Sequence, residues 1–424
     1  MKRIVALLLS AGLLTPVLAA SPATSRGKGE WPQWRGPNRD GGSSDTGLLK
    51  EWPKEGPPLL WETKGAGRGY SSLSITAGKI YTVGDGPSTA EDKNEYLLSF
   101  DEETGKQLWK AKLGPAYDVH KQESWNSSRS TPTVDGETLY VLTGGGSLVC
   151  LDTAGKEKWR KSMSGDFGGK MMSGWGYAES PLVDGDHLVC TPGGKKGTVA
   201  ALDKKTGAPV WQSSEMTDNA SYASLVPAEI GCTRQYVLLT DRSVAGIAAK
   251  DGKVLWRADR PGRTAVIPTP IVKDGIVFVT SGYGVGSNAW KISADGGKFK
   301  AEELYSGDQI TNHHGGVILV GDHVYGTDDQ KGFRCVEFKT GKIAFEARGV
   351  GKGSVAYADG HLVVRSEGGA VALVEASPGG YKETGRFNLP DRSKRPSWSH
   401  PVIAGQKLFL REGDSIHCFD LKAK

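Results

Sequence analysis

A short recurring segment constrains the fold of this chain more than any other feature. It is FDEETGKQLW at 100–109, LDTAGKEKW at 151–159, LDKKTGAPVW at 202–211 and AKDGKVLW at 249–256, with a weaker copy, KTGKIAF, at 339–345. The four tryptophans are 50, 52 and 45 residues apart, a period typical of propeller blades. The sequence therefore predicts a repeat protein.

Each copy has the composition of a β-hairpin. A Thr-Gly or Asp-Gly pair provides the positive-φ turn, and the returning strand places an indole against a neighbouring unit. A second hairpin precedes each copy, with turns at 134–136, 183–185, 273–275 and 358–360. Two hairpins make a four-stranded antiparallel blade, so the predicted fold class is all-β.

Counting first strands predicts an eight-bladed β-propeller over residues 59–424. The units are expected to start near Ser71, Ser130, Ser180, Ser224, Thr269, Gly316, Ser354 and Ser399. The last unit ends after its third strand, and an orphan strand precedes the first, so we expect the N-terminal strand to complete the final blade and remove an exposed edge. The fifth and seventh units lack a tryptophan at the docking position, which leaves the count open by one. The expected docking residues are Trp61, Trp109, Trp159, Trp211 and Trp256.

The first residues have the pattern of an export signal. Lys2 and Arg3 precede a largely apolar run at 4–14, and cleavage is expected near Ala19 or Ala20. The run is shorter than the roughly 20 residues that span a bilayer, and no cysteine lies near the cleavage point to carry a lipid. We therefore expect residues 1–20 to be a signal peptide and the chain, without a transmembrane segment, to reside in the periplasm or outside the cell.

Residues 21–58 form a leader rich in Trp, Gly and Pro. Because indoles are costly to leave in water, Trp31, Trp34 and Trp52 favour an extended strap that packs on the propeller. An exposed segment that awaits a partner is the alternative.

The charge distribution argues against a nucleic-acid-binding protein. Without Lys2 and Arg3 the chain has 51 basic and 48 acidic residues, a net charge of +3, with no long charged block that would indicate nucleic acid as a partner. We expect a monomer.

Cys150, Cys335 and Cys418 occupy the same place in three units, which predicts buried thiols. A disulfide between Cys190 and Cys232 is the minor alternative.

The Asp-x-x-Thr-Gly-Lys-x-x-Trp segments resemble the tryptophan-docking motif of PQQ-like β-propeller repeat proteins. This superfamily includes the quinoprotein alcohol dehydrogenases and the BamB subunit of the outer-membrane β-barrel assembly machinery. The leader WPQWRGPNRDG at 31–41 is similar to the start of many exported bacterial members. The resemblance covers residues 59–424 and implies the fold, but the family is functionally divided.

The chain lacks the marks of catalysis that the quinoproteins carry. Dehydrogenases of this fold have a disulfide between adjacent cysteines, a bound Ca²⁺ and an aspartate base, whereas this sequence has no adjacent cysteines and no Cys-x-x-Cys-His haem site. It also has no His-Glu-x-x-His, Gly-x-Ser-x-Gly or phosphate loop. We predict no catalytic residue, no metal site and no cofactor, with pyrroloquinoline quinone (PQQ) and Ca²⁺ as the alternative.

The first strands converge on the central channel, where their small residues are interrupted by larger ones. These form a candidate ligand mouth: Tyr70, Arg129, Tyr177, Glu179, His313, His314 and Trp398. Pairing of Glu179 with Arg129 of the neighbouring blade is an equally good interpretation. Neighbours along a strand point to opposite faces, so His313 and His314 are not expected to chelate one ion.

The function that fits these observations is a non-catalytic binding or scaffold protein of the bacterial cell envelope. It would use propeller loops or the channel mouth to hold a protein, peptide or saccharide, with an envelope complex as one such partner. A PQQ-dependent oxidoreductase with a reduced active site is the alternative.

Overall fold

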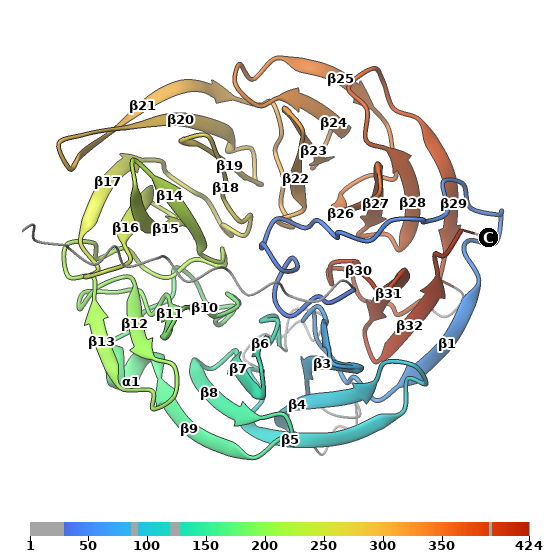
Figure 1. Cartoon of the computed structure of the whole chain (residues 1–424), viewed down its shortest axis with the longest axis horizontal. Helices are drawn as coiled ribbons and strands as arrows, with labels where there is room; N and C mark the ends of the chain where they lie inside the picture. Colours follow the sequence, from blue (N-terminus) through green and yellow to red (C-terminus); the bar gives the residue numbers. More distant parts are fainter. Residues whose placement is uncertain (1–28, 86–91, 119–127, 390–391, 424) are drawn as a thin grey trace, which may run out of the picture.

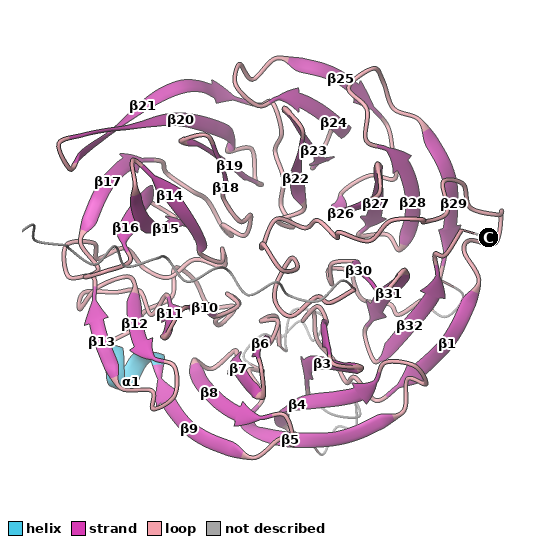
Figure 2. Ribbon diagram, in the orientation of Figure 1, coloured by secondary structure: helices cyan, strands magenta, loops and turns pink. Residues whose placement is uncertain are grey.

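The computed structural model describes residues 29–85, 92–118, 128–389 and 392–423, so the predicted signal peptide lies outside the described residues. Eight four-stranded antiparallel sheets form a closed ring (Figures 1 and 2). The predicted all-β fold and the blade count of eight are confirmed. The helix found in the described part of the chain, α1, spans only Met163–Phe167.

The first four blades follow one another in sequence. Blade 1 contains β2 (Ser74–Thr76), β3 (Lys79–Gly84), β4 (Asn94–Asp101) and β5 (Gln107–Pro115). Blade 2 contains β6 (Thr133–Asp135), β7 (Thr138–Leu142), β8 (Ser147–Asp152) and β9 (Glu157–Ser162). Blade 3 contains β10 (Leu182–Asp184), β11 (His187–Cys190), β12 (Ala200–Asp203) and β13 (Pro209–Gln212). Blade 4 contains β14 (Val226–Ile230), β15 (Thr233–Leu239), β16 (Ser243–Ala248) and β17 (Val254–Asp259).

The remaining blades complete the ring. Blade 5 contains β18 (Ile271–Lys273), β19 (Ile276–Ser281), β20 (Gly286–Asp295) and β21 (Lys298–Gly307). Blade 6 contains β22 (Val317–Val320), β23 (His323–Asp328), β24 (Gly332–Glu337) and β25 (Ile343–Ala347). Blade 7 contains β26 (Gly353–Ala358), β27 (His361–Ser366), β28 (Ala370–Glu375) and β29 (Glu383–Asn388). Blade 8 contains β30 (Val402–Ala404), β31 (Lys407–Glu412), β32 (Ser415–Asp420) and β1 (Leu59–Lys64).

Blade 8 is closed by the N-terminal strand, as the sequence predicts. Strand β1 pairs antiparallel with β32, with Trp61 opposite Cys418 and Glu62 opposite His417. In Figure 1, β1 (blue) lies beside β32 (red) at the rim of the ring. The hydrogen bonds of this pairing tie the two ends of the propeller together and remove the edge that β32 would otherwise expose.

The hydrophobic core lies between the blades. One cluster, for example, joins Tyr81 and Val83 of blade 1 to Leu139 and Val141 of blade 2. The inner strands are buried on both faces, which explains their nearly continuous apolar residues, whereas the fourth strand of each blade is half-exposed at the rim. Packing of each sheet face against the next blade therefore supplies the apolar burial.

Docking rings connect the outer strand of one blade to a turn of the next. Trp211, for example, donates its indole Nε1–H to the carbonyl of Ala249, and a methyl group on Gly252 would lie 2.4 Å from its ring. The glycine is thus needed both for its φ of 75° and for the space beneath the ring. The same arrangement places Trp61 over Gly105, Trp109 over Gly155 and Trp159 over Gly207.

Blades 4 and 5 depart from this pattern in different ways. Tyr305 takes the place of tryptophan in blade 5, lies over Gly341 and donates to the carbonyl of Phe338. Trp256 of blade 4 is 4% exposed and donates to the Gln235 amide of its own blade. In blade 5 the docking tryptophan is therefore replaced by a tyrosine, another aromatic ring with a hydrogen-bond donor at its tip.

The five cysteines are free thiols. Cys150, Cys335 and Cys418 are buried in separate blades, and burial raises the pKa of Cys150 to about 11 and that of Cys418 to about 12. Cys190 is buried and Cys232 is exposed, and no disulfide joins them.

The two faces of the ring differ. The upper face, as we define it, carries the loops between second and third strands and the connections between blades. The lower face carries the turns between first and second strands, and the leader runs along it. Trp31 exchanges two backbone hydrogen bonds with Ile75 near the first such turn, and the Leu48 N–H donates to Asp359 near another. Figure 1 shows the leader (blue) crossing the centre of the ring before it turns outward to β1.

Leader side chains enter the central channel from the lower face. Arg35 donates to the carbonyls of Gly315 and Val317 in blade 6, and Arg39 donates to the carbonyl of Ser180 in blade 3. Both arginines are buried. The leader therefore links blades 3 and 6 across the lower end of the channel.

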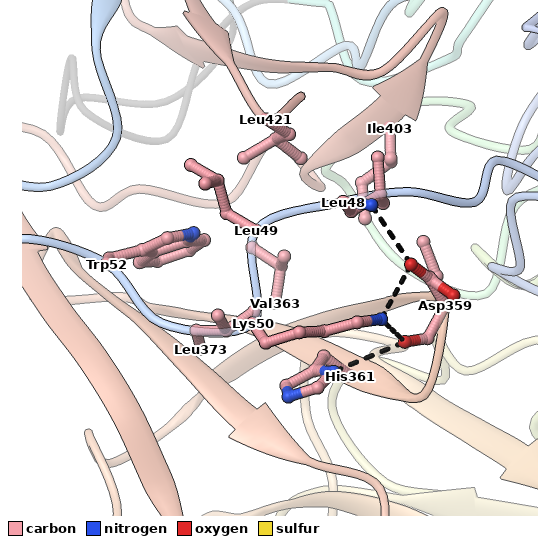
Figure 3. Close-up of a pocket in the computed structure, with 11 residues that line it drawn as sticks. Leu48, Leu49, Lys50, Trp52, Asp359, His361, Val363, Leu373, Ile403 and Leu421 are labelled. Atoms are coloured by element: carbon pink, nitrogen blue, oxygen red, sulfur yellow. Dashed lines mark hydrogen bonds and ion pairs between the residues drawn. The ribbon is translucent and has the colours of Figure 1, made fainter. Parts of the chain in front are cut away.

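Farther out, the leader packs tightly against blades 7 and 8. Figure 3 shows Leu49 and Trp52 beside Leu373 and Leu421, with Lys50 paired to Asp359. The cavity left here measures about 10 Å³, room for no more than about one water molecule. The contact is a packed interface and leaves no space for an organic ligand.

Candidate functional site

Hydroxyl side chains bridge successive blades around the channel. The N–H of Ser72 donates to Thr131 Oγ1 at 3.1 Å, the N–H of Thr131 donates to Ser180 Oγ at 2.9 Å, and the N–H of Ser180 donates to Ser224 Oγ at 3.0 Å. The Ser72 hydroxyl in turn donates to the carbonyl of His400 at 2.9 Å. These bonds show that small residues at the channel are needed for hydrogen bonding between blades as well as for space.

The hydroxyl positions fix the register of the mouth above them. Two residues before each of these channel positions in the sequence, the connection between blades brings one residue of each blade to the channel mouth on the upper face. We call this set the mouth ring: Tyr70, Arg129, Ala178, Tyr222, Ile267, His314, Lys352 and Trp398. Four of these, Tyr70, Arg129, His314 and Trp398, belong to the sequence-derived mouth.

These four residues contact one another across the mouth. The rings of Tyr70 and Trp398 are 4.5 Å apart, and those of His314 and Trp398 are 5.8 Å apart. The guanidinium of Arg129 lies 5.6 Å from the centre of the Tyr70 ring, within cation–π distance, and donates to the carbonyl of Trp175. The mouth is therefore a cluster of aromatic and cationic groups.

Tyr177 and Glu179 face their own blade instead. The Tyr177 hydroxyl donates to the carbonyl of Pro192, and a Glu179 oxygen accepts the N–H of Thr191. Glu179 is 1% exposed and has no ion pair with Arg129, so the proposed pairing of these two residues is not what the structure shows. Its second oxygen, Oε2, has no hydrogen-bond partner.

Burial raises the pKa of Glu179 to about 7. Because the pKa in the folded state lies above the unfolded value of about 4.5, the folded protein is destabilised when Glu179 ionises, and acid relieves this cost between about pH 7 and 4.5. We predict that Glu179→Gln raises the free energy of unfolding by about 1–3 kcal/mol at pH 8 and has little effect at pH 5. Urea unfolding at the two pH values measures this difference.

The exposed Glu137 of blade 2 offers a control for the same substitution. Glu137→Gln should change stability by less than about 0.5 kcal/mol at either pH, as expected of surface substitutions. A Glu179→Gln variant that is equally destabilised at pH 8 and pH 5 would show that the carboxylate is needed for its hydrogen bond rather than costly for its charge.

His313 and His314 lie in the bend before β22 and not in a strand, and their rings are 5.0 Å apart, so the strand alternation expected for them does not apply. His313 Nε2 and the Tyr283 hydroxyl are hydrogen-bonded at 3.0 Å, and burial, helped by the Lys352 charge, lowers the pKa of His313 to about 4. His314 is buried, with Nε2 3.5 Å from Glu367. Glu367 also lies 3.3 Å from the ammonium of Lys352.

The leader supports this part of the mouth from below. The Trp34 ring lies 4.4 Å from the His400 ring, and His400 Nε2 donates to the carbonyl of His314 at 2.8 Å. Burial and the nearby Arg35 lower the pKa of His400 to about 3, so the imidazole is neutral with its proton on Nε2. Trp34 thereby helps to position His314, one level above it.

Sequence reasoning missed several mouth residues. Tyr222 and Lys352 occupy mouth-ring positions that follow from the register of Ser224 and Ser354. Tyr283 and Glu367 lie in loops between second and third strands, where the repeat gives no alignment. Tyr283 has a φ of 59°, which is uncommon for an aromatic residue and occurs in a Gly-Tyr-Gly turn that only the structure identifies as strained.

A family model described as outer membrane protein assembly factor BamB matches residues 93–347, more than half of the chain. The chain belongs to the BamB family. Among solved structures, BamB from Moraxella catarrhalis is similar, with a TM-score of 0.59, 13% identity, and coverage of 86% of this chain and 98% of that one.

Other propellers share the fold with this BamB-family chain. A quinohaemoprotein alcohol dehydrogenase from Pseudomonas putida HK5 has a TM-score of 0.53 and 11% identity, covering 96% of this chain and 83% of that one. A europium-containing methanol dehydrogenase has a TM-score of 0.53 and 12% identity, covering 92% and 91%. No curated protein matches the chain in sequence.

The carboxylate of the sequence-derived mouth does not face the channel in this BamB-family chain. The one carboxylate of the sequence-derived mouth, Glu179, turns into blade 3 and away from the channel. Within the described ranges, no group of three or more His, Cys, Asp or Glu side chains is arranged to hold a metal ion.

The described residues also contain no helix long and apolar enough to cross a membrane.

Proposed function

We propose that this protein is a non-catalytic binding protein of the bacterial cell envelope that engages its ligand or partner at the upper face, around the mouth ring. Membership of the BamB family supports a binding or scaffold role, and the predicted export signal supports a location in the periplasm or outside the cell. The site residues are Tyr70, Arg129, His314, Lys352 and Trp398 of the mouth ring, together with Tyr283 and Glu367.

The occupied lower end of the channel carries this proposal. Arg35 and Arg39 are buried at that end and donate to blade carbonyls, so the leader covers it. The upper end instead presents half-buried and exposed rings and charges, including Tyr283 at 36% exposure. Groups that combine an apolar body with a polar tip are typical of binding surfaces.

Site-specific cross-linking tests which face is used. The photoreactive residue p-benzoylphenylalanine replaces Tyr283 on the upper face or, as the matched control, the exposed Asn38 at the centre of the leader. Both variants are expressed in cells with the full chain and irradiated. We expect a discrete adduct from position 283 and none from position 38. Adducts from position 38 alone, or from neither position, would contradict the proposal.

The quinoprotein alternative has its own test. Because Glu179 faces blade 3 and Glu367 is already paired with Lys352, we expect PQQ and Ca²⁺ together to leave the melting temperature within about 1 °C of that of the free protein. A saturable increase in the melting temperature that is lost in Arg129→Ala would place the chain among the quinoproteins and overturn the binding proposal.

A further inference from the structure

We infer that the upper face binds a neutral saccharide at a polar pair, Lys352 and Glu367, flanked by the rings of Tyr283, His313, His314 and Trp398. This inference rests on the proposed function and specifies the ligand that the mouth takes. The six residues come from blades 5, 6 and 7 and from the connection to blade 8. The ring nitrogens of His314 and Trp398 have no hydrogen-bond partner within the fold.

The polar pair presents a donor and an acceptor side by side. Lys352 Nζ and Glu367 Oε2 are 3.3 Å apart, and both side chains remain accessible, at 27% and 30%. Their backbones are held rigidly, because the Glu367 N–H donates to the Lys352 carbonyl at 2.7 Å and the Ser397 N–H donates to the Glu367 carbonyl at 3.0 Å. The ammonium donates and the carboxylate beside it accepts, so the pair can hydrogen-bond to two neighbouring hydroxyl groups at once.

The paired charges also argue against a charged ligand at this point. An anion that approaches Lys352 meets Glu367, and a cation that approaches Glu367 meets Lys352. A neutral molecule with several hydroxyl groups satisfies both without leaving a charge unpaired. Saccharides are the common envelope molecules with that chemistry.

A continuous row of aromatic rings lies beside the polar pair. The rings of Tyr283 and His313 are 4.5 Å apart, those of His313 and His314 are 5.0 Å apart, and those of His314 and Trp398 are 5.8 Å apart. Aromatic faces pack against the apolar C–H face of a sugar ring while its hydroxyls remain free to hydrogen-bond. The αL conformation of Tyr283 holds its ring at this border.

Buried polar atoms at the same place lack hydrogen bonds. His314, whose side chain is 3% exposed, has no hydrogen bond at Nδ1 or Nε2, although Nε2 lies 3.5 Å from Glu367, and the buried Nε1 of Trp398 has none either. Buried donors and acceptors are nearly always satisfied in proteins by protein atoms, water or a ligand. Hydroxyl groups, which both donate and accept, suit a set that contains an indole donor and an imidazole.

The surroundings do not favour an extended peptide. Peptides that add to a sheet need a free strand edge, but the first strands end their sheets at the channel, and backbone groups there are already bonded within the fold, such as the Val317 carbonyl, which accepts from Arg35. The mouth is formed by side chains from separate connections between blades, which fits a compact ring better than a strand.

The test uses the full mature chain and four named probes. Maltohexaose, cellohexaose and chitohexaose are the neutral saccharides, and hexagalacturonate is the acidic comparison; binding is followed by tryptophan fluorescence and calorimetry. We expect at least one neutral hexasaccharide to bind saturably, with a dissociation constant of roughly 0.1–1 mM, and hexagalacturonate to bind at least tenfold more weakly.

Variants locate the binding. Glu367→Gln and Tyr283→Gly should each weaken binding at least tenfold, and glycine is compatible with the φ at position 283. The matched control is Glu375→Gln, which removes the carboxylate of an exposed pair with Lys382 on the same blade and should leave the dissociation constant unchanged. Failure of all three neutral probes, preference for hexagalacturonate, or equal binding by Glu367→Gln would overturn the inference.

Cross-linking at position 283 distinguishes failure of the saccharide inference from failure of the proposed function. An adduct that a mixture of glycosidases leaves intact, and that yields peptides of a second protein on digestion and mass spectrometry, would show a protein partner at the upper face. The proposed function would then stand and the saccharide inference would fall. Absence of any adduct would overturn both.

Discussion

Replacing Arg35 by alanine is expected to lower the free energy of unfolding by about 3–5 kcal/mol, because this side chain is the main polar anchor of the leader within the channel. Its guanidinium donates to the carbonyls of Gly315, Val317 and Asp40, and burial lowers the pKa of Arg35 to about 10 without neutralising it. Alanine would leave three carbonyl groups without their donors and open a cavity. Thermal melting and urea unfolding measure the loss.

Two comparisons make the Arg35 result specific. Arg35→Lys keeps the charge but loses the planar fork that reaches several carbonyls, so it should show most of the destabilisation. Lys54→Ala alters an exposed residue of the same leader and should change stability by less than about 0.5 kcal/mol. An Arg35→Ala protein that melts like the unmodified chain would mean that the leader is held by its apolar contacts alone.

The fold was predictable because most blades repeat the same hairpin turn and the same docking contact to the next blade. The turn glycine and docking tryptophan recur with the blade period, and the truncated last unit requires a strand from elsewhere, which β1 supplies opposite β32. Tyr305 shows the limit of that reasoning. A repeat search for tryptophan misses it, yet its hydroxyl reaches the carbonyl of Phe338 as an indole N–H would.

The site was only partly predictable, since position along the chain does not determine where a side chain points. Tyr70 and Trp398 meet at the mouth because both occupy the same register in adjacent blades. Glu179 is one residue farther along, and the alternation of the strand turns it toward Thr191 of its own blade. The Tyr283 and Glu367 loops differ between blades, so no repeat could align them.

The same reasoning could not place the leader. Three tryptophans indicated packing, but the residues that enter the channel are the arginines at positions 35 and 39, which composition alone assigns to the surface. They are buried because convergence of the first strands exposes backbone carbonyls to the channel, and an arginine can donate to several of them at once.

Removing one partner of the buried ion pair between blades 7 and 8 should be as costly as the loss of Arg35. Arg365 and Glu412 are 2.6 Å apart, with side chains 0% and 1% exposed. Arg365 also donates to the carbonyls of Ser399 and Arg411, so it links both blades. Arg365→Ala leaves Glu412 buried and uncompensated, and we expect a loss of about 3–5 kcal/mol in the free energy of unfolding, measured with urea.

An exposed pair on the same blade provides the matched control. Lys382 and Glu375 are also close, at 2.5 Å, but their side chains are 68% and 34% exposed, so Lys382→Ala should cost less than about 1 kcal/mol. The double variant Arg365→Met with Glu412→Leu removes both buried charges and should recover part of the loss, because most of the cost comes from the unpaired carboxylate. A double variant less stable than Arg365→Ala would instead show that the hydrogen bonds of Arg365 and Glu412 to their other partners hold blades 7 and 8 together.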